Sequence, residues 1–272
     1  MAPSAFFLPV GTGERFCILH PAASERRKGC VVYAHPFAEE MNKSRRMVAL
    51  QASALADAGY AVLQLDLDGC GDSSGDFADA SWEGWCSDVV RACRWMREQQ
   101  PGPVWLWGLR AGVLVAAEAA RRLDFPVNLL FWQPAVAGKS LLQQFLRLSL
   151  AAELVGGNSR GAMEALRRRI DGGEPVEIAG YTLAPGLALG LEQAVLAPLP
   201  ATTTKVIWLE VSSRADATLA PVSEKTLEAL RQSGSTVFAR VANGPAFWQT
   251  SEIEEAPELI RATVDALSEV GP

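Results

Sequence analysis

The sequence predicts an α/β protein in which helices cover both faces of a mostly parallel β-sheet. Segments of apolar, strand-like character alternate with segments whose apolar residues recur every three or four positions. Short loops containing Gly or Pro separate them, which is the pattern of consecutive β-α-β units. With 272 residues, of which 49% are hydrophobic, the chain can bury a sizeable core. We therefore expect one domain over residues 1–272.

The first elements are a hairpin and a buried strand. Residues 6–10 and 15–20 have strand character and flank a Gly-Thr-Gly sequence, which predicts an amino-terminal hairpin. Residues 30–35 form a continuous apolar run, as in a parallel strand that is buried on both faces. Pro36 ends this run, because proline has no backbone N–H to continue a ladder.

Two helices and another strand follow. Between residues 41 and 59 the apolar positions have helical spacing. The strand expected at 61–67 leads into a glycine-rich loop at 68–76. Ser81 can then cap a helix over 82–96, whose apolar residues form an amphipathic stripe.

The regular alternation stops in the second half of the chain. After a strand at 128–133, the stretch from about 137 to 200 contains two helical pieces, 140–154 and 159–170, and then a mixed run with several Gly and Pro residues. We interpret this stretch as a lid inserted over the carboxyl ends of the strands. Strand, helix, strand and helix then follow at 205–211, 222–232, 236–241 and 254–267.

The centre of the chain has the order strand, sharp turn, helix. An apolar run from Val104 ends in a Gly-Leu-Arg-Ala-Gly sequence at 108–112, and an Ala-rich helical segment follows at 113–122. This order is the context of the nucleophile elbow of α/β-hydrolases, in which the central residue is normally serine. Here the central residue is Arg110, which cannot be deprotonated to attack an acyl group. The sequence therefore predicts a hydrolase fold without the usual nucleophile.

The remaining triad positions are sought in chain order, acid and then histidine. Asp216 follows the strand at 205–211 and occupies the place of the acid, although pairing with the nearby Arg214 explains it equally well. The loop at 243–248, where the histidine belongs, ends in Trp248 and contains no histidine. The sequence thus predicts that the Ser-His-Asp triad is degenerate.

Two Gly-x-Ser-x-Gly matches lie outside the elbow context. The match at 157–161 lies between helices, so Ser159 is better explained as an N-cap. The match at 71–75 follows a strand but leads into an acidic loop, and turn chemistry is the favoured explanation of Ser73. This loop nevertheless borders the expected crevice, because ligands bind at the carboxyl ends of parallel strands.

An alternative function follows from that loop. Ser73, its neighbour Ser74 or Cys70 would attack an ester or thioester with the help of His35, as in an esterase, thioesterase or acyltransferase. The N–H groups of Phe37 and Ala111 would then stabilise the oxyanion. This mechanism requires the nucleophile to lie within hydrogen-bond reach of the base.

Arg110 itself has two open interpretations. A guanidinium near a helix amino terminus suits a carboxylate, phosphate or sulfate. Alternatively, Arg110 is paired internally with Glu39, Glu40, Asp66 or Asp216 and fills an inactive site. Glu39 and Glu40 are also typical of an exposed helix start, where the dipole favours acids.

Composition excludes several classes of function. The net charge of −6 argues against a nucleic-acid partner. The five cysteines have no CxxC spacing, and with two histidines a structural zinc site is not expected, nor is any other cofactor. The amino terminus lacks a signal-peptide pattern and no apolar run is long enough for a membrane span, so we expect a cytoplasmic protein. A homodimer is left open.

Three stretches, at 35–46, 66–77 and 107–112, resemble the second of the hydrolase families associated with the exosortase A system. The resemblance extends over most of the chain. It implies an α/β-hydrolase fold and a role near exopolysaccharide production, and it names no substrate.

Three hypotheses follow. In the first, a lidded hydrolase fold binds an acyl, glycosyl or phosphorylated ligand, or a partner, through Arg110 in a crevice lined by residues such as Phe37, Ala111, Glu39, Glu40 and Trp248. The second is the enzyme with a noncanonical nucleophile. The third is a scaffold protein whose crevice is closed and whose Arg110 is fully paired.

Overall fold

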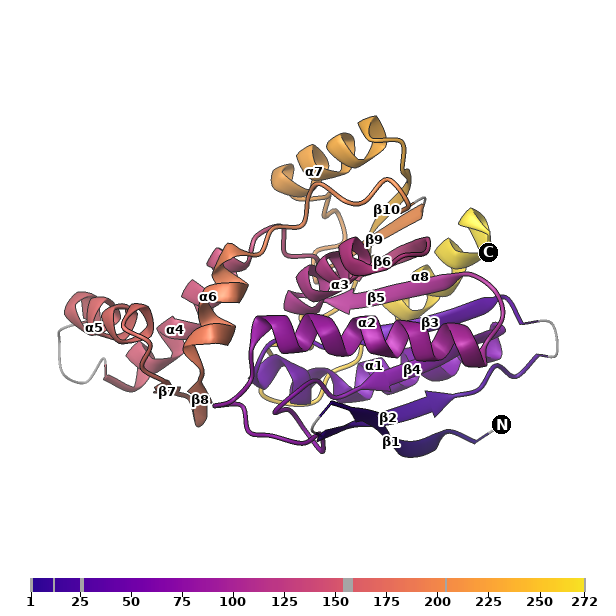
Figure 1. Ribbon diagram of the computed structural model, residues 1–272. Helices are drawn as coiled ribbons and strands as arrows, with labels where there is room; N and C mark the ends of the chain where they lie inside the picture. Colours follow the sequence, from indigo (N-terminus) through magenta and orange to yellow (C-terminus); the bar gives the residue numbers. More distant parts are fainter. Residues whose placement is uncertain (1, 12, 25–26, 154–158, 204, 272) are drawn as a thin grey trace.

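An eight-stranded sheet forms the centre of the molecule (Figure 1). The computed structural model describes residues 2–11, 13–24, 27–153, 159–203 and 205–271. In these residues the sheet has the strand order β1-β2-β4-β3-β5-β6-β9-β10. Its strands are β1 (Ser4–Val10), β2 (Gly13–His20), β3 (Gly29–Ala34), β4 (Tyr60–Leu65), β5 (Val104–Leu109), β6 (Val127–Trp132), β9 (Lys205–Ser212) and β10 (Thr236–Asn243).

The predicted α/β class and mostly parallel sheet are confirmed. The strands from β4 to β10 in the sheet order are parallel, and β2 is antiparallel to both β1 and β4. Ala34 pairs with Gly108, and Leu109 pairs with Trp132. Strands β3, β5 and β6 therefore end at the same level, and the segments that follow them meet at this edge.

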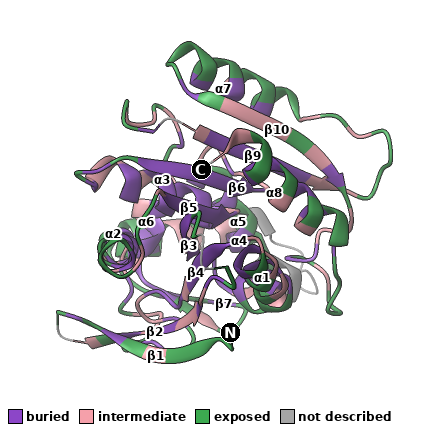
Figure 2. Cartoon of the chain, turned by 90° about the vertical axis from the view of Figure 1, so that its right-hand side faces the viewer, coloured by how far each residue is buried: buried purple, intermediate pink, exposed green. Residues whose placement is uncertain are grey.

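Helices cover both faces of the sheet. One apolar core lies under α2, α3 and α7, and a second lies under α1 and α8. Figure 2 shows the buried strands between helices whose outer surfaces are exposed. The helices are α1 (Glu39–Asp57), α2 (Trp82–Gln99), α3 (Ala111–Arg122), α4 (Gly138–Glu153), α5 (Ser159–Asp171), α6 (Pro185–Gln193), α7 (Pro221–Gln232) and α8 (Pro257–Val270).

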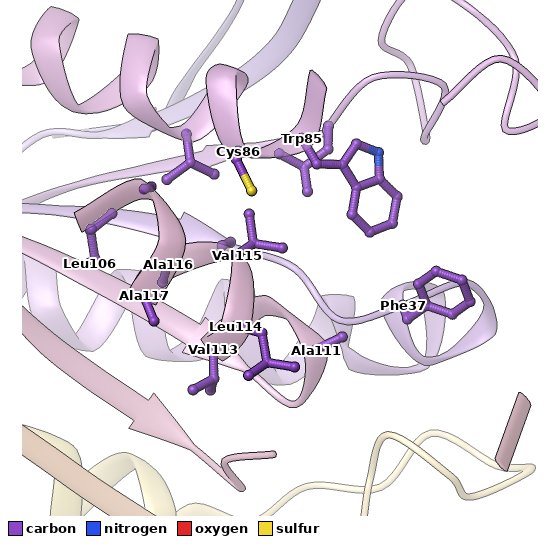
Figure 3. Close-up of a cluster of buried hydrophobic side chains, with 14 of the residues drawn as sticks. Phe37, Trp85, Cys86, Leu106, Ala111, Val113, Leu114, Val115, Ala116 and Ala117 are labelled. Atoms are coloured by element: carbon purple, nitrogen blue, oxygen red, sulfur yellow. The ribbon is translucent and has the colours of Figure 1, made fainter. Parts of the chain in front are cut away.

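The first core joins α2, α3 and the loop after β3. Figure 3 shows Cys86 of α2 facing Val115 of α3, with Phe37 on the same side as Trp85. The predicted cap of α2 is confirmed, because the Ser81 side chain accepts a 3.0 Å hydrogen bond from the N–H of Gly84. None of the described helices is both long and apolar enough to cross a membrane.

The stretch predicted as a lid lies between β6 and β9 and is called the α4–α6 segment. In addition to the two expected helices, it contains a hairpin of β7 (Val176–Ile178) and β8 (Tyr181–Leu183), followed by α6. Strands of three residues are too short to show a period, and α6 is too uniformly apolar to show a face, so the sequence indicated neither. Gly157 and Asn158 lie outside the described residues, and α5 begins at Ser159.

Figure 1 shows the α4–α6 segment beyond the carboxyl ends of β3 and β5. Its two ends lie together, because Ala137 forms an antiparallel bridge with Val195 and the N–H of Gly138 donates to Ala194 at 2.9 Å. That the segment acts as a lid, and that residues 1–272 are one domain, remain predictions.

Candidate functional site

The turn between β5 and α3 has the geometry that its glycines predict. Arg110 has a φ of 55° and a ψ of −115°, which costs about 1–3 kcal/mol for a non-Gly residue. A Cβ at Gly112 would lie 2.1 Å from the carbonyl oxygen of Ala34, and one at Gly108 would lie 2.6 Å from the backbone of Val113. The glycines thus let strand and helix approach closely enough to impose this sharp turn.

Three side chains surround the Arg110 guanidinium. Its Nε donates to Glu40 at 3.2 Å, and its Nη2 lies 3.1 Å from the same carboxylate. Nη2 also donates to Oε1 of Gln144 at 2.9 Å, and the guanidinium carbon lies 5.8 Å from the ring centre of Trp248. The Arg110 side chain is 14% exposed. The structure thus brings Arg110, Glu40 and Trp248 together, and it pairs the guanidinium internally with Glu40 and Gln144.

Glu40 lies in the first turn of α1, after another strained turn. Ala38 has a φ of 49° and a ψ of −123°, close to the values of Arg110. Burial raises the pKa of the Glu40 carboxyl, and the charge and hydrogen bond of Arg110 offset only part of this effect. The neighbouring Glu39 is half-buried, its Oε2 has no hydrogen-bond partner, and burial raises its pKa as well. Of the four acids proposed as internal partners of Arg110, the structure selects Glu40.

His35 joins two loops and does not face a nucleophile. Its Nδ1 donates to the carbonyl of Pro36 at 2.7 Å, and its Nε2 accepts the N–H of Leu67 at 3.2 Å. Burial lowers the pKa of this imidazole, so it is neutral near pH 7. Both ring nitrogens are occupied by backbone groups, which leaves neither available to take a proton.

Ser73 and Cys70 also lack a base. The Ser73 hydroxyl donates to the carbonyl of Asp66 at 2.5 Å and accepts the N–H of Phe16 at 2.9 Å. Cys70 is buried, and burial raises the pKa of its thiol far above the ordinary value. Among the described residues, no hydrogen bond joins either side chain to His35. This geometry supports the turn-chemistry interpretation of Ser73 and gives neither Ser73 nor Cys70 a base.

The two other acids considered for the site have different partners. Asp66 accepts from Arg45 at 3.1 Å. Asp216 is 79% exposed and lies 3.5 Å from the Nη2 of Arg214, which confirms the proposed local pair. The structure therefore places neither acid on Arg110.

Among the described residues, no group of three or more His, Cys, Asp or Glu side chains is placed to hold a metal ion. The candidate site consists of an arginine, an acid, an amide and aromatic rings. Such groups bind ligands through charge, hydrogen bonds and apolar contact.

Comparison with known proteins assigns the chain to a family. Residues 25–162, about half of the chain, match the family described as serine aminopeptidase, S33. The chain belongs to this S33 family. The matched residues include β3, β5, the Arg110 turn and α3.

Solved structures show that this S33 member has the α/β-hydrolase fold. Est1E from Butyrivibrio proteoclasticus, solved with ferulic acid bound, is 15% identical, with a TM-score of 0.66 over 97% of this chain and 98% of that one. XC6422 from Xanthomonas campestris, described as an α/β serine hydrolase without lid, is 18% identical. Its TM-score is 0.58 over 99% of this chain and 95% of that one. At such identities the likeness shows the fold alone.

A human relative matches over a shorter stretch. Protein ABHD12B is 33% identical over 109 residues, which are 40% of this chain and 29% of that protein. The S33 member thus matches less than a third of the relative's length.

Residues of the α4–α6 segment complete the site and were not found from the sequence. Gln144 and Phe145 are neighbours on α4; Gln144 reaches Arg110, and the ring of Phe145 lies 5.0 Å from Phe37. The Phe37 ring also contacts Phe77 at 5.6 Å. An exposed glutamine in an amphipathic helix has no distinguishing signal, because such residues are typical of a solvated face. The contributions of the Phe37 and Ala111 N–H groups remain predictions.

Proposed function

We propose that this S33 member is a ligand-binding protein without Ser-His-Asp chemistry, and that Arg110 binds an anionic or acyl ligand. The observation that carries the proposal is the surroundings of Arg110. At the turn where α/β-hydrolases normally present the serine, a guanidinium is held by Glu40, Gln144 and Trp248.

The chemistry of these side chains argues against covalent catalysis. A guanidinium does not release a proton in proteins, so it cannot become a nucleophile. Trp248, from the loop after β10, lies against Arg110 where the fold would place its histidine. An indole only donates a hydrogen bond and cannot act as a base. The site therefore lacks both groups that acyl transfer requires.

The same side chains favour the binding of an anion. The hydrogen bonds that described residues make with Arg110 use Nε and Nη2, which leaves Nη1 for a ligand oxygen. Burial raises the pKa of the neighbouring Glu39 carboxyl, which lowers the negative charge that it would oppose to an anion. Phe37 and Phe145 are buried and pack on each other beside this site, and the partly exposed Tyr181 next to Phe145 would supply apolar surface for an acyl or aryl group. Ferulic acid, the ligand of Est1E, combines both features and is a suitable probe.

The first experiment combines a turnover assay with ligand-dependent melting. We expect no hydrolysis of p-nitrophenyl acetate, p-nitrophenyl decanoate or decanoyl-CoA. We expect ferulate or decanoate to raise the melting temperature of the wild type and of the matched control Arg214→Ala, but not that of Arg110→Ala. Phosphate and sulfate are tested in parallel, because a guanidinium binds them by the same chemistry.

Each contrary outcome has a clear meaning. Turnover that is lost in Ser73→Ala or Cys70→Ala would establish an unorthodox hydrolase. No response to any anion in the wild type would reject the ligand and favour the scaffold with a closed crevice.

The sequence resemblance supports a biological setting for this binding protein. We propose that it acts in the cytoplasm beside exopolysaccharide production. Deleting the gene should then lower exopolysaccharide yield, and wild-type protein but not Arg110→Ala should restore it. Light scattering on the purified protein decides between a monomer and a homodimer.

A further inference from the structure

A concave surface lies beside α2, at residues that the Arg110 site does not use. A groove of about 620 Å³ runs between α2, strand β1 and the end of α3. Its volume lies within the range of typical ligand sites, which is roughly 300–1,000 Å³. It shares no lining residue with the Arg110 site, so it can be considered independently.

The groove is elongated. Its lining includes Glu83 and Glu98 of α2, which are fifteen positions apart and thus separated by about 22 Å along the helix. Leu8 of β1 and Val90 of α2 form an apolar floor between these ends. This shape suits an extended chain better than a compact small molecule.

An aromatic ring is fixed in the wall of the groove. Trp95 lines it and is only partly buried, and the Phe6 ring packs against Trp95 with a centroid distance of 5.0 Å and an interplanar angle of 34°. One turn earlier on α2, Arg91 donates to the carbonyl of Pro9 at 3.3 Å. These contacts tie α2 to β1 and hold the indole in place for a ligand.

Charged groups of both signs flank this ring. Arg94 and Glu98 are exposed, and among the described residues neither has an ion pair or hydrogen bond to a side chain. At the other end, Arg122 forms an ion pair with Glu83 at 2.5 Å. The groove therefore has free donors and a free acceptor beside an aromatic face.

We propose that this groove binds an extended oligosaccharide that carries carboxylate groups. The C–H face of a sugar ring packs on an indole, while Arg and Glu side chains hydrogen-bond neighbouring hydroxyls. Arg91 and Arg94 would pair with the carboxylates. An acyl chain would instead remove these charges from water without compensation.

Isothermal titration calorimetry with defined tetrasaccharides tests the proposal. The probes are tetragalacturonate and tetramannuronate, which are acidic, and cellotetraose, which is neutral. We expect at least one acidic probe to bind about tenfold more tightly than cellotetraose, and Arg94→Gln to weaken that binding about tenfold. Trp95→Ala should abolish it, and circular dichroism shows whether this variant is folded.

Two control variants separate the groove from the crevice. Arg110→Ala and the exposed Arg214→Gln should bind the acidic probe like the wild type. Absence of binding by both acidic probes, or binding that Arg94→Gln leaves unchanged, would overturn the proposal. So would binding that requires Arg110. Because the anion test at Arg110 uses other probes and another variant, either proposal can fail without the other.

Discussion

Two turns of this chain have glycines at both ends and a polar residue in the middle. They differ in the surroundings of that central side chain. At 108–112 the central Arg110 stands between a strand and a helix, and its side chain reaches Glu40 and the α4–α6 segment. At 71–75 the central Ser73 is buried and bonded to two backbone groups. Backbone groups occupy the Ser73 hydroxyl, and the residue at the elbow is one that cannot attack. Placement between strand and helix, and not the sequence of the motif alone, decides which side chain stands at the elbow.

The largest expected effect comes from the last glycine of the elbow. A Cβ in Gly112→Ala would lie 2.1 Å from the carbonyl oxygen of Ala34, and backbone atoms cannot move aside. We expect the free energy of unfolding to fall by about 3 kcal/mol or more, measured by urea denaturation. The matched control is Gly75→Ala, whose nearest neighbour would be at 3.4 Å and whose φ of 86° alone is unfavourable, at about 1 kcal/mol. Equal losses in the two variants would show that the elbow is not the tighter turn.

Removing the partner of Arg110 should have the next largest effect. Glu40→Ala leaves a largely buried guanidinium without its counter-charge, so we expect a loss of about 3 kcal/mol in urea denaturation. Asp216→Ala, which breaks an exposed pair, should stay within about 0.5 kcal/mol of the wild type. An unchanged free energy of unfolding in Glu40→Ala would mean that Gln144 and solvent are sufficient partners for the guanidinium.

Ser73→Ala tests the structural role of the serine loop. The variant leaves the N–H of Phe16 and the carbonyl of Asp66 without their partner, which should cost about 1–2 kcal/mol of unfolding free energy. The melting response to ferulate should not change, because Ser73 takes no part in the Arg110 site. A changed melting response to ferulate, with an unchanged free energy of unfolding, would show that Ser73 acts in the Arg110 site and not in the structure of its loop.

The smallest effect is a dependence on pH. The pKa of Glu40 is raised above its ordinary value of 4.5, so in the window above pH 4.5 the folded protein retains a proton that the unfolded chain has lost. Its contribution to stability therefore falls as pH rises through this window. Binding of sulfate, which stays ionised in this window, should weaken in the same direction, because ionised Glu40 competes for Arg110.

Glu40→Gln isolates this contribution. The raised pKa of Glu39 also lowers stability as pH rises. The lowered pKa of His35 has the opposite effect, in the range below the ordinary value of 6.5. Both residues remain in the variant. The difference between the wild-type and Glu40→Gln denaturation curves at successive pH values thus reports Glu40 alone. A difference that does not vary with pH would show that the pKa of Glu40 is the same in the folded and the unfolded protein.

The sequence could predict elements that carry a local signal. The run from Val104, the two glycines and the Ala-rich segment after them each have a physical reason to form strand, turn and helix. The position of Trp248 followed from chain order, because parallel strands bring their carboxyl-end loops to one edge.

Contacts that depend on distant packing could not be predicted. Gln144 reaches Arg110 only because α4 lies over the elbow, and nothing in its local sequence separates it from other exposed helix residues. That Arg110 pairs with Glu40 and not with Glu39 depends on the direction in which the first turn of α1 faces. The backbone bonds of His35 and Ser73 join loops far apart in the chain, which composition and spacing do not reveal.

The narrow base of the α4–α6 segment makes this part of the chain a module. Its ends are held side by side by the bridge between Ala137 and Val195, so the chain leaves the sheet and returns at one point. A short turn joining these ends would pay almost no additional loop-closure entropy. The segment can therefore vary in length without a change in the strand pairing of the sheet.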